Sequence, residues 1–287
     1  MAWPSGAKDT TPILIDAVMS IKTYQVLKSV GLSDQRVTRM LVAAKSENFS
    51  VDQVVWPKGE GQQPWTHVIS GLVCACVPDV DGGFNPVNIY GPGAWFGEAA
   101  ILNRQASTVE YVCLSPAHVV TIPCTEALKA FEYDAEFCRY IARLAIWRSQ
   151  QHAEMLSLMR MGSPALRVVM GLALFAEAMA SSSSHLPHFE YEDTLDIPLK
   201  QSTLASMCGV SRGIFSVCVK QLAAAGLVRV NYATVCLVGL KTWGRFSDTH
   251  RQNRLNLVKP SMQDILSLMQ AASVDDRALA SNRKLAT

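Results

Sequence analysis

The spacing of apolar and polar residues changes along the chain, and each spacing predicts a different kind of element. From Phe49 to Pro123 the apolar runs are short and are separated by turn-forming Asp and Gly residues, which predicts antiparallel hairpins. From Thr125 to Met161 apolar positions recur at helical spacing, which predicts one long helical tract. Gly162-Ser163-Pro164 interrupts this tract, because Pro164 fits the first turn of a new helix capped by Ser163. The pattern therefore predicts a domain boundary at residue 162.

A shorter helix is predicted to begin after Ser33, which caps a segment with apolar residues at helical spacing. Residues 1–22 show no strong periodicity, so we expect a flexible lead-in. The predicted organisation has five parts: the lead-in at 1–22, a strand-rich domain at 23–124, a long helix at 125–162, a second domain at 163–240, and a C-terminal extension at 241–287.

The long helix carries a stripe of positions that alternate by four and three residues: Phe137, Ile141, Leu144, Arg148, Gln151, Met155 and Leu158. A 3.5-residue repeat is typical of a coiled-coil seam, so the stripe predicts a homodimer. Alternatively, the stripe packs on the strand-rich domain of the same chain. Two of its seven positions, Arg148 and Gln151, are polar.

Composition narrows the class of protein. Of the 287 residues, 49% are hydrophobic, which suffices for globular cores. The longest uninterrupted apolar run, Val168–Ala176, is too short to span a bilayer, and the N-terminus does not resemble a signal peptide, so we expect a cytoplasmic protein. Residues 1–162 have a net charge of −2 and residues 163–254 a net charge of +3. A basic second half is typical of a nucleic-acid reader.

The cysteines and histidines predict neither a metal site nor a bound cofactor. The eight cysteines are scattered through apolar sequence, as reduced buried thiols are. Cys74 and Cys76 point to the same face of a predicted strand, either as packing residues or as a redox pair. His185 and His188 are three residues apart but lie in a Ser- and Pro-rich loop, and no nucleophile–base pair or phosphate loop is found. We therefore expect no enzyme.

Two motifs carry the candidate chemistry. The stretch from Gly91 to Val109 is Gly-rich, has an apolar rim, and places the carboxylate of Glu98 next to Gly97; it resembles the phosphate-binding cassette of cyclic-nucleotide-binding β-rolls. Residues 199–225 fit a helix-turn-helix with a tight turn at Gly209 and a second helix from Ser211, and residues 226–238 fit a wing hairpin.

A cassette followed by a DNA reader is similar to the Crp/Fnr transcription regulators, the cyclic-AMP receptor protein family, over residues 24–240. The resemblance implies an α+β fold: an N-terminal antiparallel β-roll that senses an effector, a long dimerisation helix, and a C-terminal winged helix-turn-helix. It also implies a bacterial homodimer that binds an inverted repeat in double-stranded DNA and acts with RNA polymerase, away from the membrane.

The resemblance places the ribose-binding carboxylate on Glu98, but the Arg-Ser pair that holds the phosphate in the family falls on Ser107-Thr108. Burying a phosphodiester without its cation is costly, so we expect an effector other than a cyclic nucleotide, or none. Apolar cassette walls favour an uncharged or aromatic effector; Arg104 as a substitute cation is the alternative. The expected effector pocket comprises Gly97, Glu98, Ala99, Ser107, Thr108 and, from the long helix, His152 next to Ala153. A histidine there could ligate haem or bind an acidic effector; alternatively it is a polar residue on the helix surface.

On the reader, Arg212 matches the base-reading Arg of the family, which forks onto guanine. Gly213 and Val217 replace a Glu and an Arg that are common there, so the half-site should differ. The expected DNA-binding residues are Lys200, Gln201, Ser202, Ser211, Arg212, Gly213, Ser216 and Lys220, with Arg229 near the backbone. Residues 241–254 mix basic residues with Trp243 and Phe246, and either extend the DNA contact or form a solvated linker.

Overall fold

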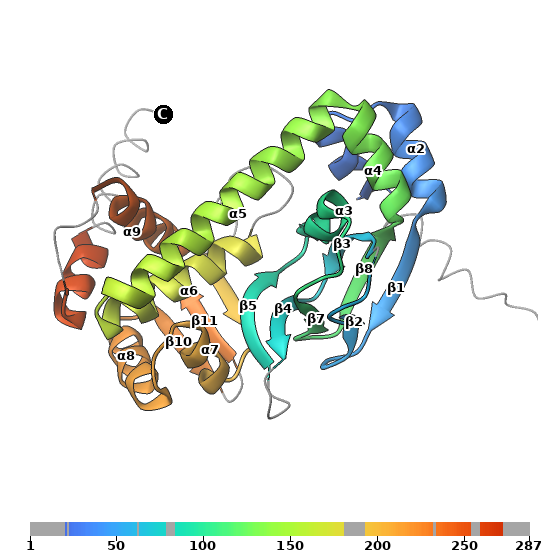
Figure 1. Ribbon diagram of the computed structural model, residues 1–287. Helices are drawn as coiled ribbons and strands as arrows, with labels where there is room; N and C mark the ends of the chain where they lie inside the picture. The colour runs from blue at the N-terminus through green and yellow to red at the C-terminus, as the bar shows by residue number, and fades with distance from the viewer. Residues whose placement is uncertain are drawn as a thin grey trace, which may run out of the picture.

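The computed structural model describes residues 21, 23–61, 63–78, 84–180, 193–231, 234–253 and 259–271. Two lobes lie side by side, and the long helix α5 (Ala135–Met161) runs across both of them (Figure 1). The first lobe is built on strands and the second mainly on helices, as the apolar pattern predicts. The predicted lead-in at 1–22, the loop histidines His185 and His188, and the end of the predicted extension lie outside the described residues, apart from Ile21.

The first lobe is a roll of two four-stranded antiparallel sheets. One sheet has the order β1 (Lys45–Phe49), β8 (Ala117–Ile122), β3 (Trp65–Ser70), β6 (Trp95–Phe96). The other has the order β2 (Val54–Trp56), β7 (Glu110–Cys113), β4 (Val73–Pro78), β5 (Phe84–Tyr90). All pairings within both sheets are antiparallel, as predicted. Of the strands in these two sheets, however, only β4 and β5 pair as a hairpin of consecutive strands, and the other pairs join strands farther apart in the chain.

Helices cover one end of the roll: residues 23–29, α2 (Asp34–Ala43), α4 (Cys124–Tyr133) and the start of α5. Ser33 caps α2 as predicted, since its side chain accepts a hydrogen bond from the Arg36 amide at 3.3 Å. The single helical tract predicted over residues 125–161 is wrong. It is broken at Asp134, whose carboxylate accepts from the Phe137 amide at 3.2 Å and caps α5.

An aromatic cluster fastens α5 to the roll. Trp65 and Trp95 stack with their ring centroids 3.7 Å apart, and Phe137 of α5 meets Trp65 edge-on at 5.0 Å. All three side chains are buried. Aromatic pairs of this geometry contribute about 0.5–1.5 kcal/mol beyond the area that they bury, so the cluster fixes where α5 leaves the roll.

The second lobe begins at α6 (Pro164–Ala180), directly after α5. It continues through β9 (Thr194–Ile197), α7 (Gln201–Met207), α8 (Arg212–Ala224) and the hairpin of β10 (Val228–Asn231) and β11 (Thr234–Val238). The three strands form one antiparallel sheet in the order β10-β11-β9. This is the winged helix-turn-helix that the sequence predicts.

The described part of the C-terminal extension belongs to this lobe. Helix α9 (Leu240–Asn253) buries Trp243 and Phe246 in the same core as α6, α7 and α8, and the helix at 262–271 adds Met262, Ile265 and Met269. Neither predicted alternative, an added DNA contact or a solvated linker, describes a segment that fills the core. The second domain therefore extends beyond residue 240.

Helix α6 approaches the turn of the helix-turn-helix closely at Gly171. A methyl group at Gly171 would lie 2.6 Å from Sγ of Cys208, which ends α7 and is buried. Only a residue without a side chain lets the sulfur pack against the α6 backbone. This contact sets the distance between α6 and the helix-turn-helix.

We expect Gly171→Ala to lower the free energy of unfolding, although alanine is the better helix former. Overpacking of this kind costs about 1–3 kcal/mol. In Gly171→Ala/Cys208→Ala the nearest atom of residue 208 becomes Cβ, at 3.6 Å, so the second substitution should restore part of the loss. Denaturant unfolding of wild type, both single variants and the double variant measures this coupling. A Gly171→Ala protein as stable as wild type would contradict it.

Candidate functional site

The cassette follows β6 and is shaped by Gly97. This glycine has φ of 98°, and a methyl group on it would lie 2.6 Å from the carbonyl oxygen of Pro64. The left-handed conformation and the missing side chain let the chain turn sharply into the short helix α3 (Glu98–Asn103). Glu98 is thereby placed at the first position of α3, on the side that faces α5.

Glu98 is paired with Arg148 of α5, a contact that the sequence did not predict. The guanidinium of Arg148 donates from Nη1 to Oε1 of Glu98 and from Nη2 to the carbonyl oxygen of Trp95. The side chains of Arg148 and Glu98 are only 11% and 14% exposed. The Arg148 Cζ atom also lies 5.2 Å from the centroid of the Tyr90 ring. A cation therefore does stand in the cassette, but it comes from the long helix and is already neutralised.

Burial opposes the charged form of Arg148, but the neighbouring Glu98 and Tyr90 outweigh burial, so the pKa of Arg148 is raised. Burial also raises the pKa of Tyr90, which stays protonated at neutral pH. The site is therefore a pair of opposite charges beside a neutral phenol, in which Oε1 of Glu98 is paired while Oε2 is buried without a hydrogen-bond partner among the described residues.

The residues expected to hold a phosphate do not face such a ligand. The Ser107 hydroxyl donates to the Val109 carbonyl oxygen at 2.8 Å and accepts from the Val109 amide at 3.2 Å. Its hydrogen bonds therefore stabilise the turn in which it lies. Thr108 is exposed. Arg104 pairs with Glu132 of α4 at 3.2 Å, and its side chain is 70% exposed. In this structure the Arg104 guanidinium is therefore directed to α4 and not to the cassette.

The helix residues expected beside the cassette are also different. His152 and Ala153 are exposed, and Arg148, one turn earlier, makes the contact instead. Ala99, next to Glu98 on α3, is exposed as well. Of the expected pocket residues, the structure therefore brings Gly97 and Glu98 together at the cassette, and adds Arg148.

The predicted dimer seam faces the interior of the single chain. Phe137, Ile141 and Leu158 are buried, and Arg148 from the same stripe contacts Glu98. The interpretation that this stripe packs on the lobes of the same chain is the one that the structure shows. The opposite face of α5 is exposed and carries a second stripe with the same alternation of four and three residues: Ala142, Ile146, Ser149, Ala153 and Leu156.

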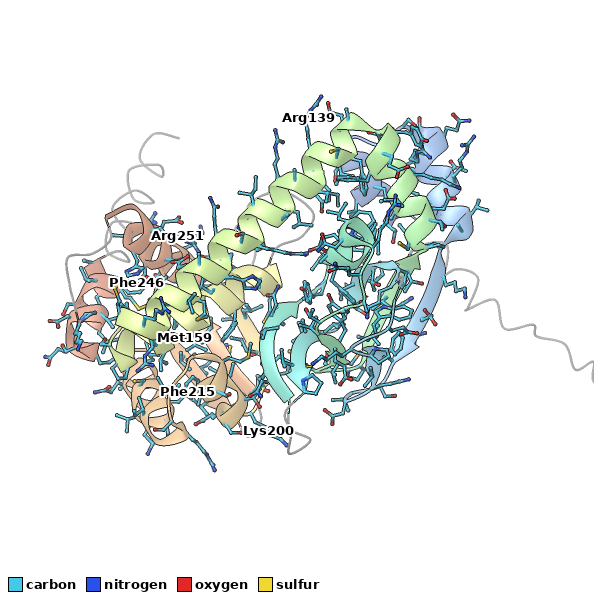
Figure 2. All side chains as sticks on the ribbon, in the orientation of Figure 1. Arg139, Met159, Lys200, Phe215, Phe246 and Arg251 are labelled. Carbon is cyan, nitrogen blue, oxygen red and sulfur yellow. The ribbon has the colours of Figure 1, made fainter. Side chains whose placement is uncertain are left out.

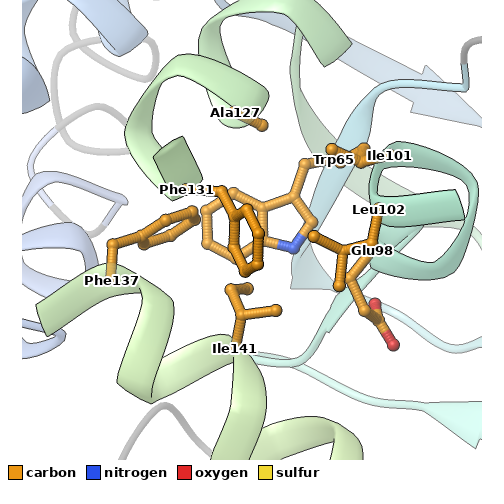
Figure 3. Close-up of a pocket in the computed structure, with 8 residues that line it drawn as sticks. All are labelled: Trp65, Glu98, Ile101, Leu102, Ala127, Phe131, Phe137 and Ile141. Atoms are coloured by element: carbon orange, nitrogen blue, oxygen red, sulfur yellow. The ribbon is translucent and has the colours of Figure 1, made fainter. Parts of the chain in front are cut away.

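A small apolar hollow lies between α3, α4 and the start of α5 (Figure 3). It is partly open to solvent, has a cavity volume of about 10 Å³, and is lined by Trp65, Glu98, Ile101, Leu102, Ala127, Phe131, Phe137 and Ile141. In Figure 3 the Glu98 carboxylate points away from the rings, so only its aliphatic stem borders the hollow. A charged ligand would find no partner in it.

The helix-turn-helix is held by a glycine turn and a helix cap. Gly209 turns the chain with φ of 63°, and its carbonyl oxygen accepts from Nη1 of Arg167 on α6 at 2.8 Å. The Ser211 side chain caps α8 by accepting from the Ile214 amide at 3.3 Å. The inner face of α8 is buried through Phe215, Cys218, Val219 and Leu222.

The outer face of α8 is open. Ser211, Arg212, Gly213 and Lys220 are exposed and Ser216 is half-buried, while at the start of α7 Lys200 and Ser202 are exposed and Gln201 is half-buried. Figure 2 shows Phe215 within the lobe and Lys200 at its edge. The structure therefore brings the predicted DNA-binding residues onto accessible surface. It adds two exposed apolar residues, Ile214 and Val217.

A buried polar network joins α9 to the two helices at the junction of the lobes. Arg251 donates to Glu154 of α5 at 3.0 Å and to Glu177 of α6 at 2.6 Å, and Ser247 donates to Glu177 at 2.8 Å. Figure 2 shows Arg251 and Phe246 beside the end of α5. Arg251, one of the basic residues in the 241–254 segment, thus connects α9 with α5 and α6.

Ser163, between α5 and α6, is bound from both sides. Its hydroxyl caps α6 by accepting from the Leu166 amide at 3.2 Å, and it donates to the Pro260 carbonyl oxygen at 2.6 Å. The segment that follows α9 therefore closes over the junction between the long helix and the DNA reader.

Among the described residues, no three His, Cys, Asp or Glu side chains come together as metal ligands would. No single helix among them has both the length and the hydropathy of a bilayer span; α7 and α8 reach that level only when taken together, across a bend of 103°.

Cys74 and Cys76 are both buried and pack with Val112.

Residues 46–134 match the family model of the cyclic nucleotide-binding domain, whereas no curated protein sequence matches the chain. FixK2 from Bradyrhizobium japonicum has a similar structure over 70% of this chain and 96% of its own, with 13% identity and a TM-score of 0.57. The c-di-GMP-responsive global regulator CLP from Xanthomonas campestris is similar over 72% and 100%, with 17% identity and a TM-score of 0.52.

A CRP-family transcriptional regulator from Thermus thermophilus is similar over 70% of this chain and 96% of its own, with 18% identity and a TM-score of 0.51. The chain therefore combines a cyclic nucleotide-binding-type β-roll with a winged helix-turn-helix. This is the α+β fold of the Crp/Fnr transcription regulators, which confirms the resemblance of the sequence at the level of the fold.

Proposed function

We propose that the chain is a sequence-specific DNA-binding transcription regulator of the Crp/Fnr type. The observation that carries this proposal is the presentation of α8: its inner face is buried, and Arg212, Gly213 and Lys220 lie on its open face. A helix held in this way enters the major groove by its N-terminal residues. The likeness to a CRP-family regulator supports the same function.

The charge of the reader supports DNA as its partner. Residues 199–225 contain Lys200, Arg212 and Lys220 and no Asp or Glu. Each basic residue that meets a phosphate releases a counterion, so binding gains affinity and becomes dependent on salt. We assign the contacts with the DNA phosphate backbone to Lys200 and Ser202, at the start of α7, and to Arg229 on the wing.

The Arg148–Glu98 pair supports a regulator that needs no cyclic nucleotide. An effector bound at the cassette would have to connect α3 with the long helix, and here the protein makes that connection with its own guanidinium. A nucleotide would first have to separate two mostly buried charges. We infer that the β-roll is held permanently in one arrangement. An effector at this end of the roll would have to widen the small apolar hollow beside α3, whose walls favour an uncharged molecule.

We place the dimer interface on the exposed stripe of α5. Ile146 and Leu156 are 60% and 56% exposed, and the positions around them are small: Ala142, Ser149 and Ala153. Exposed apolar residues repeating every 3.5 residues favour a parallel pair of helices. Such a two-fold dimer would bind an inverted repeat. We assign its place of action to the bacterial cytoplasm, with RNA polymerase as a further partner.

The DNA contact is tested with two variants. Arg212→Ala should cost about 1–3 kcal/mol of specific binding and relax the preference at one base pair of each half-site. Lys200→Ala should weaken binding to all sequences alike and reduce the salt slope by about one. Binding selection on random duplexes, followed by salt titration on the selected operator, measures both. Equal sequence preference in wild type and Arg212→Ala would contradict the assignment of α8.

The dimer interface is tested by charge. Ile146→Glu/Leu156→Glu should give monomers in sedimentation and a much weaker affinity for the operator. The matched control is Val42→Glu/Tyr133→Glu, which places the same charges at two residues that are 83% and 76% exposed elsewhere on the first lobe. The control should remain dimeric. A wild-type protein that sediments as a monomer at micromolar concentration would overturn the proposal.

The closed cassette is tested by calorimetry with cyclic AMP. Wild type should show no binding at about 100 µM ligand, a level at which even a weak site of about −5 kcal/mol is detected. Ser107→Arg supplies the missing phosphate cation, but Glu98 stays paired with Arg148, so we expect little gain. In Ser107→Arg/Arg148→Met the carboxylate is free to accept from a ribose hydroxyl, and affinity should appear. A micromolar dissociation constant in wild type would refute the closed cassette.

A further inference from the structure

The DNA-reading helix exposes a branched apolar side chain that the fold does not use. Val217 on α8 is 58% exposed, while Phe215 and Val219 on either side of it in sequence are buried. Valine is a weaker helix former than alanine, and at this exposure it gains little from burial. The side chain therefore costs helix stability without contributing to the core, which indicates that it meets a partner.

The position of Val217 identifies the surface that this partner occupies. Val217 lies one helical turn after Gly213 and one turn before Lys220, on the open face of α8. A methyl group at Gly213 would have only the Ser211 Oγ within 4.0 Å, so the helix surface there is flat and open. A base pair can approach the backbone at Gly213 closely, and the Val217 methyl groups then reach the floor of the groove.

Valine can recognise only one feature of the major groove. It has no hydrogen-bond donor or acceptor, so it cannot read the amino, carbonyl or ring-nitrogen groups of a base edge. The apolar group in the major groove is the C5 methyl of thymine. Val217 is five residues from Arg212, about 7.5 Å along the helix, which corresponds to roughly two base pairs.

We propose that Val217 reads the C5 methyl of a thymine about two base pairs from the guanine contacted by Arg212. This inference rests on the proposed function, because it concerns a base within the operator. It assigns Arg212 to a hydrogen-bonded base edge and Val217 to an apolar one. The base pair facing Gly213 is left without a side-chain contact from that position.

The experiment uses the full-length protein and the operator obtained by binding selection. Each thymine of the half-site is replaced in turn by deoxyuridine, which removes the methyl group and keeps the Watson–Crick pair. At one position wild type should lose about fourfold in affinity per half-site, the effect of withdrawing one buried methyl group. At the same position 5-methylcytosine should be bound better than cytosine, because it restores the methyl group.

Val217→Ala should bind the thymine operator more weakly and lose the discrimination against deoxyuridine. The matched control is Val230→Ala, the same chemical change at a 43% exposed residue of the wing, which should keep the discrimination. Val217 is exposed, so its replacement by alanine leaves the core of α8 intact. Val217→Arg should shift the preference at that position toward guanine.

The outcomes separate this inference from the proposed function. Binding without any sequence preference would overturn both. A sequence preference that depends on Arg212, but with no thymine sensitive to loss of its methyl group, would overturn the role of Val217 alone. A methyl effect of equal size in wild type and Val217→Ala would overturn it as well.

Discussion

The ion pair between Arg148 and Glu98 is the contact on which the position of α5 depends. It joins residues 50 positions apart and connects the cassette of the roll to the middle of the long helix. Removing two charges from water is unfavourable unless each finds its partner and further hydrogen bonds. Here the Trp95 carbonyl oxygen and the Tyr90 ring supply part of that compensation. Because the pair holds only in one geometry, α5 has a defined distance from the roll along its length.

The position of α5 in turn determines that of the second lobe. Leu72 and Ile89 of the roll share one buried core with α6, α7 and α8. A methyl group at Gly91 would lie 2.7 Å from the carbonyl oxygen of Met179 on α6, so the lobes meet backbone to backbone. They are therefore one packed unit across the junction at Gly162, and not two bodies joined by a flexible hinge.

The parts of this structure that could be predicted are those with local causes. Gly97 and Gly209 mark turns, because glycine readily adopts the positive φ that each turn requires. Ser33 and Ser211 mark the starts of helices, because their side chains cap them. The exposed face of α8 followed from the helical spacing of its buried residues. The same local reasoning could not predict which face of α5 packs inward, because both of its faces carry a stripe that alternates by four and three residues.

Contacts between residues far apart in the sequence were the second feature that the sequence patterns could not predict. Arg148 has no distinguishing neighbours in sequence, and its role appears only when α3 is placed beside α5. Likewise Trp243 and Phe246 sit among basic residues, a pattern that suited a surface as well as a core. Their burial depends on α6, which lies far earlier in the chain. Local pattern carries no information on which distant surface is left uncovered.

The burial of Met262, Ile265 and Met269 has a consequence for how the protein is made. These side chains complete the core that supports α7 and α8, and Pro260 accepts the hydrogen bond of Ser163 at the junction. During synthesis the β-roll has all its strands early, whereas the DNA reader leaves the ribosome before the residues that stabilise it. The nascent reader therefore remains incomplete until the chain beyond residue 269 has emerged.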